Sequence, residues 1–154
     1  MPTRIPASEL AGLAGRELPA SSWFPITQER INQFADATND HQFIHVSPLR
    51  AKFTPFGRPI AHGFLSLSML SFLTAEHALI PDNVKMVINY GSDKVRFLAP
   101  VKVGQRIRAQ QRIMETTEKK PGQWLVKTDV SVEIEGEETP ALVAEMLARL
   151  ILKN

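Results

Sequence analysis

The chain has 154 residues, a net charge of +2, 44% hydrophobic and 22% charged residues. These values predict one globular domain over residues 1–154, large enough to form a core without cross-links. The sequence contains no cysteine, which excludes disulfides, thiolate nucleophiles and cysteine-based zinc sites. Scattered basic residues without interleaved aromatics argue against nucleic-acid binding, and no apolar run could span a membrane. We therefore expect a cytoplasmic protein without a signal peptide.

The N-terminal third is expected to contain a short strand and two helices. Residues 15–25 are typical of a strand interrupted by a proline. Thr27 is a suitable N-cap for a helix over residues 28–37, and Ser47-Pro48 has the start pattern of a second, short helix. The segment between the two helices has no helical period and is expected to be a loop.

Residues 62–78 are predicted to form the main helix. Their apolar side chains surround the helix axis and do not fit one stripe, which is typical of a helix buried on several sides. At about 1.5 Å per residue this helix would be about 25 Å long, enough to cross a small sheet.

After the main helix the hydrophobic period changes to two, which predicts strands. The last segment has a helix-favouring composition but alternates like a strand, and we interpret it as a strand because the preceding hairpin needs a partner. The sum is an α+β fold in which an antiparallel sheet wraps one helix, and joining two sheet edges in a dimer would cover the exposed edge. The predicted strands are residues 84–90, 94–98, 105–115, 123–135 and 141–152.

Asp40 and His45 lie five residues apart in the loop before the main helix. Loops held by a rigid scaffold often carry catalytic groups, and histidine exchanges protons near neutral pH. The pair is therefore a candidate for adding water to an activated double bond. The alternative is that Asp40 ends a helix by local hydrogen bonding and His45 is a packed loop histidine.

Gly63 opens the main helix, where the first N–H groups have no intrahelical partner. Such an N–H can stabilise a developing negative charge, but a glycine here also permits close packing of the backbone. Ser71 is either a site residue or a serine bonded to the carbonyl four residues earlier. His41 and His45 have the spacing of a zinc pair, but no helix and no third ligand accompany them, so we expect no metal.

Arg106, Arg108 and Arg112 lie on one face of a predicted strand. They form either a solvated sheet face or an anion-facing edge for a nucleotide or phosphopantetheine tail.

Two longer motifs complete a recognisable pattern. Residues 59–63 read Pro-Ile-Ala-His-Gly, and residues 94–104 read Lys-Val-Arg-Phe-Leu-Ala-Pro-Val-Lys-Val-Gly. With Asp40 and His45 they resemble the MaoC-like, or hydratase-2, family of (R)-specific enoyl-CoA hydratases and dehydratases, whose motif is Asp-x-Asn-Pro-x-His followed by His-Gly. Gln42-Phe43 stands where that family has Asn-Pro, a variant similar to the nodulation-protein-N-like branch.

The resemblance covers the chain from about Ile26 onward. It implies the hotdog fold, an α+β fold with a long central helix wrapped by an antiparallel β-sheet and an overhanging helical and loop segment before that helix. It also implies (R)-specific hydration or dehydration of a trans-2-enoyl thioester, such as enoyl-CoA to (3R)-3-hydroxyacyl-CoA, by a homodimer or higher homo-oligomer. The substrate is expected to be either an acyl-CoA or an acyl-carrier thioester. No cofactor is expected apart from the coenzyme A of the substrate. The implied site residues are Asp40 and His45 as the catalytic pair, Gly63 as the oxyanion hole, and Gln42, His62 and Ser71 as substrate-binding residues.

Two alternatives remain at the level of the sequence. A hotdog acyl-CoA thioesterase would need a carboxylate on or beside the central helix, which offers only Glu76 near its far end. A non-catalytic acyl-thioester-binding subunit would keep the resemblance without the chemistry, and the altered Gln42-Phe43 pair leaves this open.

Overall fold

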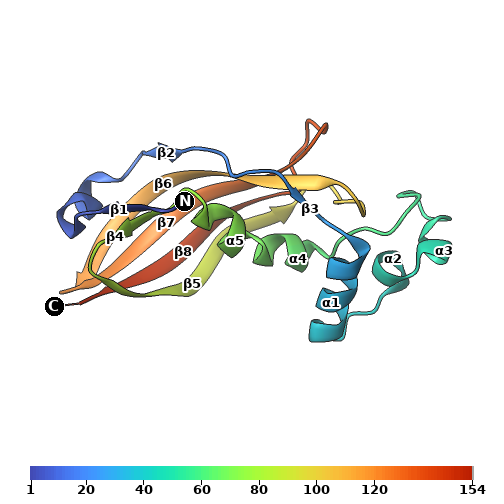
Figure 1. The fold of residues 1–154 in the computed structure, drawn as a ribbon, viewed down its shortest axis with the longest axis horizontal. Coiled ribbons are helices and arrows are strands. Elements are labelled where there is room, and N and C mark those ends of the chain that lie inside the picture. Colours follow the sequence, from blue (N-terminus) through green and yellow to red (C-terminus); the bar gives the residue numbers. More distant parts are fainter. Residues whose placement is uncertain (154) are drawn as a thin grey trace.

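The computed structural model describes residues 1–153, and its largest part is a curved antiparallel sheet (Figure 1). The strand order is β2-β6-β7-β8-β5, and β3 also pairs with β6, so that β5 is a long edge strand. A small parallel sheet joins β1 and β4 near the 3-10 helix η1. The elements are β1 (Thr3–Ile5), η1 (Ala7–Gly12), β2 (Glu17–Leu18), β3 (Phe24–Pro25), β4 (Leu79–Pro81), β5 (Val84–Phe97), β6 (Arg106–Lys120), β7 (Gln123–Ile134) and β8 (Leu142–Leu152).

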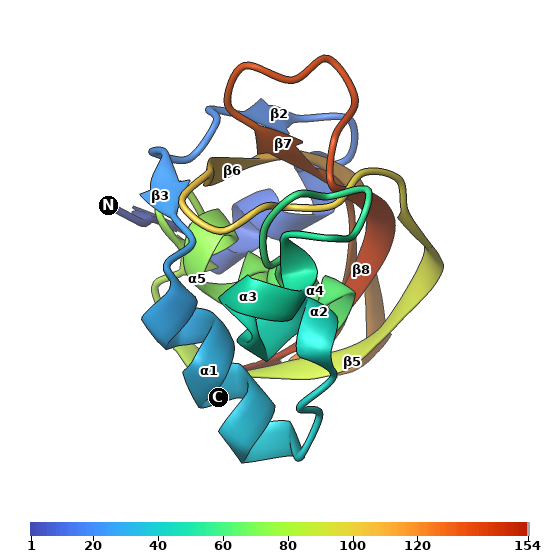
Figure 2. The ribbon, with the colours of Figure 1, turned by 90° about the vertical axis from the view of Figure 1, so that its right-hand side faces the viewer.

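Two short consecutive helices, α4 (Gly63–Ser68) and α5 (Leu70–Ala75), lie along one side of the sheet, which curves around them (Figures 1 and 2). The helices that precede α4 in the sequence project beyond one end of the sheet (Figure 1). This is the α+β hotdog arrangement with an overhanging segment, as predicted. The overhanging helices are α1 (Gln28–Thr38), α2 (Phe43–Val46) and α3 (Pro48–Ala51).

The main core lies between the central helices and the sheet. Apolar side chains of α4 and α5 meet the alternating apolar residues of β6, β7 and β8, which point to this face because side chains alternate along a strand. Burial of this continuous apolar surface fixes the helices on the sheet and thereby fixes the position of Gly63. The core includes Leu65, Leu70, Leu73, Ile107, Ala109, Val130, Val132, Ile134 and Leu142.

The central helix is shorter than the predicted range of 62–78 and is interrupted at Met69. The Ser68 hydroxyl donates to the Phe64 carbonyl at 2.7 Å, and such back-bonding by serine bends helices. The helix is expected to be buried on several sides, and Leu65, Leu70 and Leu73 are buried, but Phe64 is 67% and Phe72 is 58% exposed in the single chain.

The local signals at helix starts are confirmed. The Thr27 hydroxyl accepts a hydrogen bond from the Arg30 N–H at 3.2 Å, and the Ser47 hydroxyl accepts one from the Arg50 N–H at 3.3 Å. The final segment is a strand, as interpreted from its alternation. None of the helices among residues 1–153 has the length and apolar character needed to cross a membrane.

Two local predictions are wrong. The loop expected around His45 contains the one-turn helix α2, closed by hydrogen bonds from His45 N–H to the Gln42 carbonyl and from Ser47 N–H to the Phe43 carbonyl, both at 3.0 Å. The two strands expected over 84–90 and 94–98 form one strand, β5, because the irregular stretch between them continues the pairing with β8 through shifts of register.

Candidate active site

The overhanging helices deliver the predicted catalytic pair to one place. Helix α1 ends at Thr38, and the following Asn39, whose φ of 59° is left-handed, turns the chain away from the helix axis. Asp40 follows this turn, and His45 lies on α2. The Gln28 side-chain amide donates to the His45 carbonyl at 2.8 Å and so fastens α2 to α1.

The buried imidazole of His45 has a defined tautomer. Its Nδ1 lies 2.7 Å from the Ile60 carbonyl oxygen. A carbonyl can only accept a hydrogen bond, so Nδ1 carries the proton and the Nε2 of the neutral ring holds a lone pair. The Ile60 backbone therefore prepares Nε2 of His45 to act as a base.

The environment keeps His45 neutral. Burial lowers the pKa of His45 from its usual value of 6.5, and the neighbouring His62 lowers it further. The hydrogen bond to the Ile60 carbonyl and the charge of Asp40 oppose this change, but the net direction is downward. A neutral imidazole at physiological pH is the form that can accept a proton.

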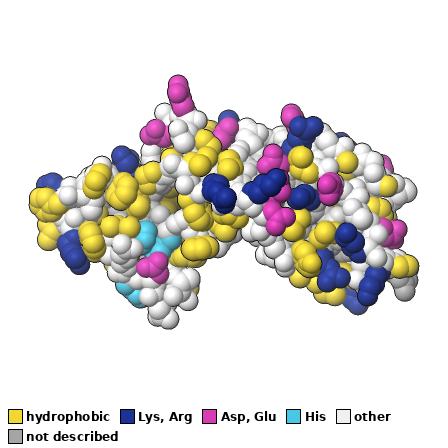
Figure 3. Space-filling view, turned by 180° about the vertical axis from the view of Figure 1, so that it is seen from behind, with side chains coloured by type: hydrophobic (Ala, Val, Ile, Leu, Met, Phe, Trp, Pro, Cys, Tyr) yellow, Lys and Arg dark blue, Asp and Glu magenta, His cyan; other side chains and the backbone are white. Residues whose placement is uncertain are grey.

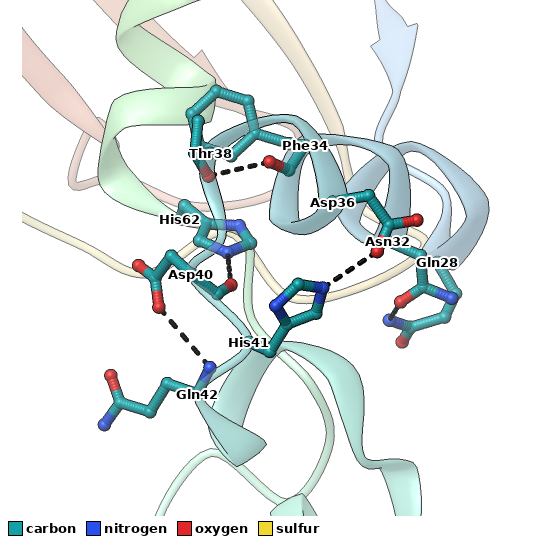
Figure 4. A network of polar contacts seen from close by, with 9 residues as sticks. All are labelled: Gln28, Asn32, Phe34, Asp36, Thr38, Asp40, His41, Gln42 and His62. Carbon is teal, nitrogen blue, oxygen red and sulfur yellow. Dashed lines mark hydrogen bonds and ion pairs between the residues drawn. The ribbon is translucent and has the colours of Figure 1, made fainter.

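His62 packs behind the predicted catalytic pair. Its buried ring stacks on the His45 ring, with centroids 3.9 Å apart, and it contacts the Phe34 ring on α1. Nε2 of His62 donates to the Asp40 backbone carbonyl at 2.9 Å (Figure 4). His62 thus holds Asp40 and His45 together. It is predicted to bind substrate, but it does not line the adjoining cavity.

A cavity of about 280 Å³ adjoins His45 and the start of α4. In the described part of the chain, the Gly63 N–H has no hydrogen-bond partner. An unpaired N–H beside a basic imidazole can stabilise a negatively charged oxygen while the imidazole moves a proton. The lining residues are His45, Phe56, Ile60, Ala61, Gly63, Ser66, Phe97, Leu98, Ala99, Pro100, Val101 and Ala141.

The Asp40 carboxylate lies at the exposed edge of the site. It accepts only a weak hydrogen bond from the Gln42 N–H, at 3.4 Å (Figure 4). The space-filling view shows histidine side chains beside an acidic one at the end of the molecule that carries the overhanging helices (Figure 3). One carboxylate oxygen therefore remains available to a bound water or substrate.

The other predicted substrate contacts are placed differently. Gln42 is exposed and begins α2. Ser71 is exposed and does not line the cavity, whereas Ser66 is buried and does. Sequence reasoning missed Ser66, yet its spacing of three residues from Gly63 places it on the same helix face.

The residues that could hold a metal are Asp40, His45 and His62, whose possible ligand atoms lie within 4.8 Å of one another. The two stacked rings have planes only 22° apart, so their in-plane lone pairs run side by side and do not converge. The His62 nitrogen that faces Asp40 also carries a proton, which it donates to the Asp40 carbonyl. This donor set suits proton transfer better than metal coordination. His41 instead contacts Asp36 at 2.8 Å on the surface.

Glu76 is occupied elsewhere. Its carboxylate accepts hydrogen bonds from the N–H and the hydroxyl of Ser22, both at 2.7 Å, and these bonds lower its pKa. Glu76 does not line the cavity beside His45. The central helices therefore offer no carboxylate to this cavity.

The row of arginines on β6 is largely neutralised. Arg106 pairs with Glu135 and Arg108 pairs with Glu133 across the sheet, and Arg108 also lies over the Trp23 ring at 4.5 Å. This arrangement matches the solvated-face interpretation of the row.

Comparisons with known proteins show the family to which the chain is similar. A family model described as "MaoC like domain" matches residues 9–137. The chain is 45% identical over 144 residues to 3-hydroxyacyl-thioester dehydratase Z of Mycobacterium tuberculosis, covering 94% of this chain and 95% of that protein. It is 43% identical over 145 residues to Nodulation protein N of Rhizobium meliloti, covering 94% and 90%. Among solved structures, a monoamine oxidase regulatory protein from Archaeoglobus fulgius superposes with a TM-score of 0.76 at 26% identity, covering 92% of each chain.

Proposed function

We propose that this chain, which belongs to the MaoC-like domain family, catalyses reversible hydration of a trans-2-enoyl thioester to a (3R)-3-hydroxyacyl thioester. The observation that carries the proposal is the tautomer of His45, whose Nδ1–H is donated to the Ile60 carbonyl so that Nε2 is a free base beside Asp40. The relative named 3-hydroxyacyl-thioester dehydratase Z supports the same reaction in the opposite direction.

In this reaction Asp40 and His45 hold one water between them. The water oxygen bonds to C3 while a proton passes to the pair, and the pair returns a proton to C2 on the same side. The electron pair of the double bond moves toward the thioester oxygen, which becomes negatively charged. The unpaired N–H of Gly63 stabilises that oxygen, and removing one such donor from an enzyme typically costs about 10²–10³ in rate.

Coenzyme A is the carrier that the charges beside the cavity favour. Residues 41–75 contain no Asp or Glu but include Arg50, Lys52 and Arg58. Within residues 1–153, none of these three cations lies within 4.0 Å of a carboxylate. They lie in the same segment as Phe56, which lines the cavity. Unpaired cations at this position suit the phosphate groups of coenzyme A.

The edge strand β5 supports a homodimer. It exposes several large apolar side chains, and unpaired strand edges of this kind invite pairing with another chain. A second copy placed edge to edge would cover both the backbone groups and the apolar side chains. The exposed large apolar residues in the first half of the strand are Met86, Val87, Ile88 and Tyr90.

The test is the loss of ultraviolet absorbance of crotonyl-CoA with the purified protein. We expect hydration by the wild type and at least about a hundredfold slower turnover by Asp40→Asn and by His45→Gln, because positioned acid–base groups contribute about 10²–10⁴. Asp36→Asn is the matched control, because Asp36 is an exposed carboxylate that contacts His41 outside the site. The product should be oxidised by a dehydrogenase specific for (3R)-3-hydroxyacyl-CoA and not by one specific for the 3S form.

Two outcomes would overturn the proposal. Release of free thiol without hydration would identify a thioesterase. Tight binding of crotonyl-CoA without turnover, together with no activity on longer or branched enoyl thioesters, would identify a non-catalytic binding subunit.

A further inference from the structure

The space beside Gly63 is occupied by a neighbouring side chain, whereas the backbone conformation of Gly63 does not itself favour glycine. Gly63 begins a right-handed helix and lies outside the left-handed region that favours glycine. A Cβ at this position would lie 3.0 Å from both Cδ1 and Cε1 of Phe97 and 3.2 Å from its Cγ. The Phe97 ring therefore packs directly on the Gly63 Cα, one bond from the N–H of the oxyanion site.

Phe97 stands at the open side of the cavity. It is the last residue of β5, follows a shift of register between Asp93 and Arg96, and is 48% exposed. Its ring also meets the Phe64 ring edge-on, with centroids 5.7 Å apart. The buried lining residues Val101 and Ala141 mark the closed side. A thioester that enters from solvent would meet the half-exposed Phe97 ring before it reaches the buried Val101 and Ala141.

The following step rests on the proposed function. A thioester oxygen that accepts the Gly63 N–H lies about 2.9 Å from its nitrogen, which places the carbonyl carbon within about 4 Å of that nitrogen. The atoms bonded to the carbonyl carbon, C2 and sulfur, then lie beside the ring packed on Gly63. Carbon atoms in contact are about 3.5–4.0 Å apart, so a substituent on C2 that points toward the Phe97 ring would collide with it.

We propose that Phe97 is a specificity-determining residue that excludes enoyl thioesters with a substituent at C2. Position 63 is a glycine so that the Phe97 ring can take this place beside the oxyanion N–H. Phe97 and Gly63 thus act together, although they come from segments that are distant in the sequence.

The experiment compares kcat/KM for three substrates: crotonyl-CoA, its 2-methyl derivative tiglyl-CoA, and trans-2-octenoyl-CoA. For Phe97→Ala and Phe97→Leu, we expect the kcat/KM for tiglyl-CoA divided by that for crotonyl-CoA to rise at least about tenfold over the wild-type value. One extra carbon in a tight pocket changes kcat/KM by about this much. The kcat/KM for octenoyl-CoA divided by that for crotonyl-CoA should stay within about twofold of the wild-type value, because residues other than Phe97 would contact the end of the acyl chain. Phe72→Ala is the control, since Phe72 is an exposed phenylalanine of α5 that does not line this cavity.

This role of Phe97 would be overturned if the kcat/KM ratio for tiglyl-CoA did not change in the variants, or if the ratio for octenoyl-CoA rose equally. Hydration of crotonyl-CoA by the wild type would still support the proposed function. No turnover of any substrate by the wild type would instead count against the proposed function. Thermal unfolding tests the packing without activity. Gly63→Ala should lower the melting temperature of the wild type but not that of Phe97→Ala, and equal effects in both backgrounds would contradict the contact.

Discussion

The imidazole of His62 stacks on that of His45, with ring centroids 3.9 Å apart and planes 22° apart. The same ring donates a hydrogen bond to the Asp40 carbonyl at 2.9 Å. One buried side chain thus contacts both members of the proposed catalytic pair, which precede it in the sequence by 22 and 17 residues. Because His62 does not line the cavity beside His45, we propose a positioning role for it.

Replacing His62 with phenylalanine keeps an aromatic ring in the stack but removes the hydrogen bond to Asp40. We expect kcat to fall by about tenfold with little change in KM, because the loss acts on the geometry of the pair, and a factor of ten corresponds to about 1.4 kcal/mol. The pKa of His45 should rise, because His62 is one of the causes that lower it. The acid limb of the pH–rate profile would therefore move to higher pH.

The control is His77→Phe, because His77 is a histidine next to Glu76 at the far end of the central helices. A His62→Phe enzyme with the wild-type rate and pH profile would mean that His62 only fills space.

The lowered pKa of His45 also predicts a dependence of stability on pH. The unfolded chain, with a histidine pKa of 6.5, binds the proton before the folded chain does as the pH falls. The contribution of His45 to the free energy of unfolding should therefore be constant above pH 6.5. It should decrease as the pH falls from 6.5 to the pKa of His45 in the folded chain. Urea unfolding of the wild type and of His45→Gln across this range measures the difference, and parallel curves for the two proteins would refute it.

The acid limb of kcat/KM should lie below pH 6.5 for the same reason, because the neutral ring is the base. An acid limb above this value would show that the charge of Asp40 outweighs burial at His45.

Much of the fold follows from local patterns. The alternation in residues 123–134 and the caps at Thr27 and Ser47 predict elements that form as expected, because period and capping act within a few residues. The break at Met69 depends on which way the neighbouring serine hydroxyl turns, and composition alone does not specify this. The segment predicted as one continuous helix is therefore helical, but it is shorter than predicted and divided in two.

The site is predictable only in part, for a physical reason. Asp40, His45 and Gly63 are named by their chemistry and spacing. The Ile60 carbonyl that sets the His45 tautomer is a backbone atom with no signature in the sequence. The contact between Gly63 and Phe97 joins two segments that meet only once β5 has folded beside the central helices. Such long-range contacts follow from tertiary packing and carry no local period.

Removing the cations beside the cavity should weaken the binding of coenzyme A esters. We expect the combined variant Lys52→Ala/Arg58→Ala to raise KM for crotonyl-CoA by about tenfold at low salt with kcat unchanged, because exposed charges contribute mainly to binding and are screened by salt. Crotonyl-pantetheine, which lacks the nucleotide and its diphosphate, should show the same KM with both enzymes.

The matched control is Lys119→Ala/Lys120→Ala, which removes two lysines from the hairpin between β6 and β7. Equal effects of the two double variants would indicate a general effect of net charge, and an unchanged KM for crotonyl-CoA would mean that these cations do not hold the carrier.

The proposed dimer predicts different effects for two apolar side chains of similar exposure. Ile88, on the edge strand β5, is 42% exposed, and Met114, on the interior strand β6, is 40% exposed. Glutamate at position 88 would bring like charges of two copies together at a joined edge, whereas glutamate at position 114 would remain in water. In sedimentation velocity we expect a dimer for the wild type and for Met114→Glu, and a monomer for Ile88→Glu. A wild-type monomer, or an Ile88→Glu variant that stays dimeric, would show that the exposed edge of β5 is not the interface.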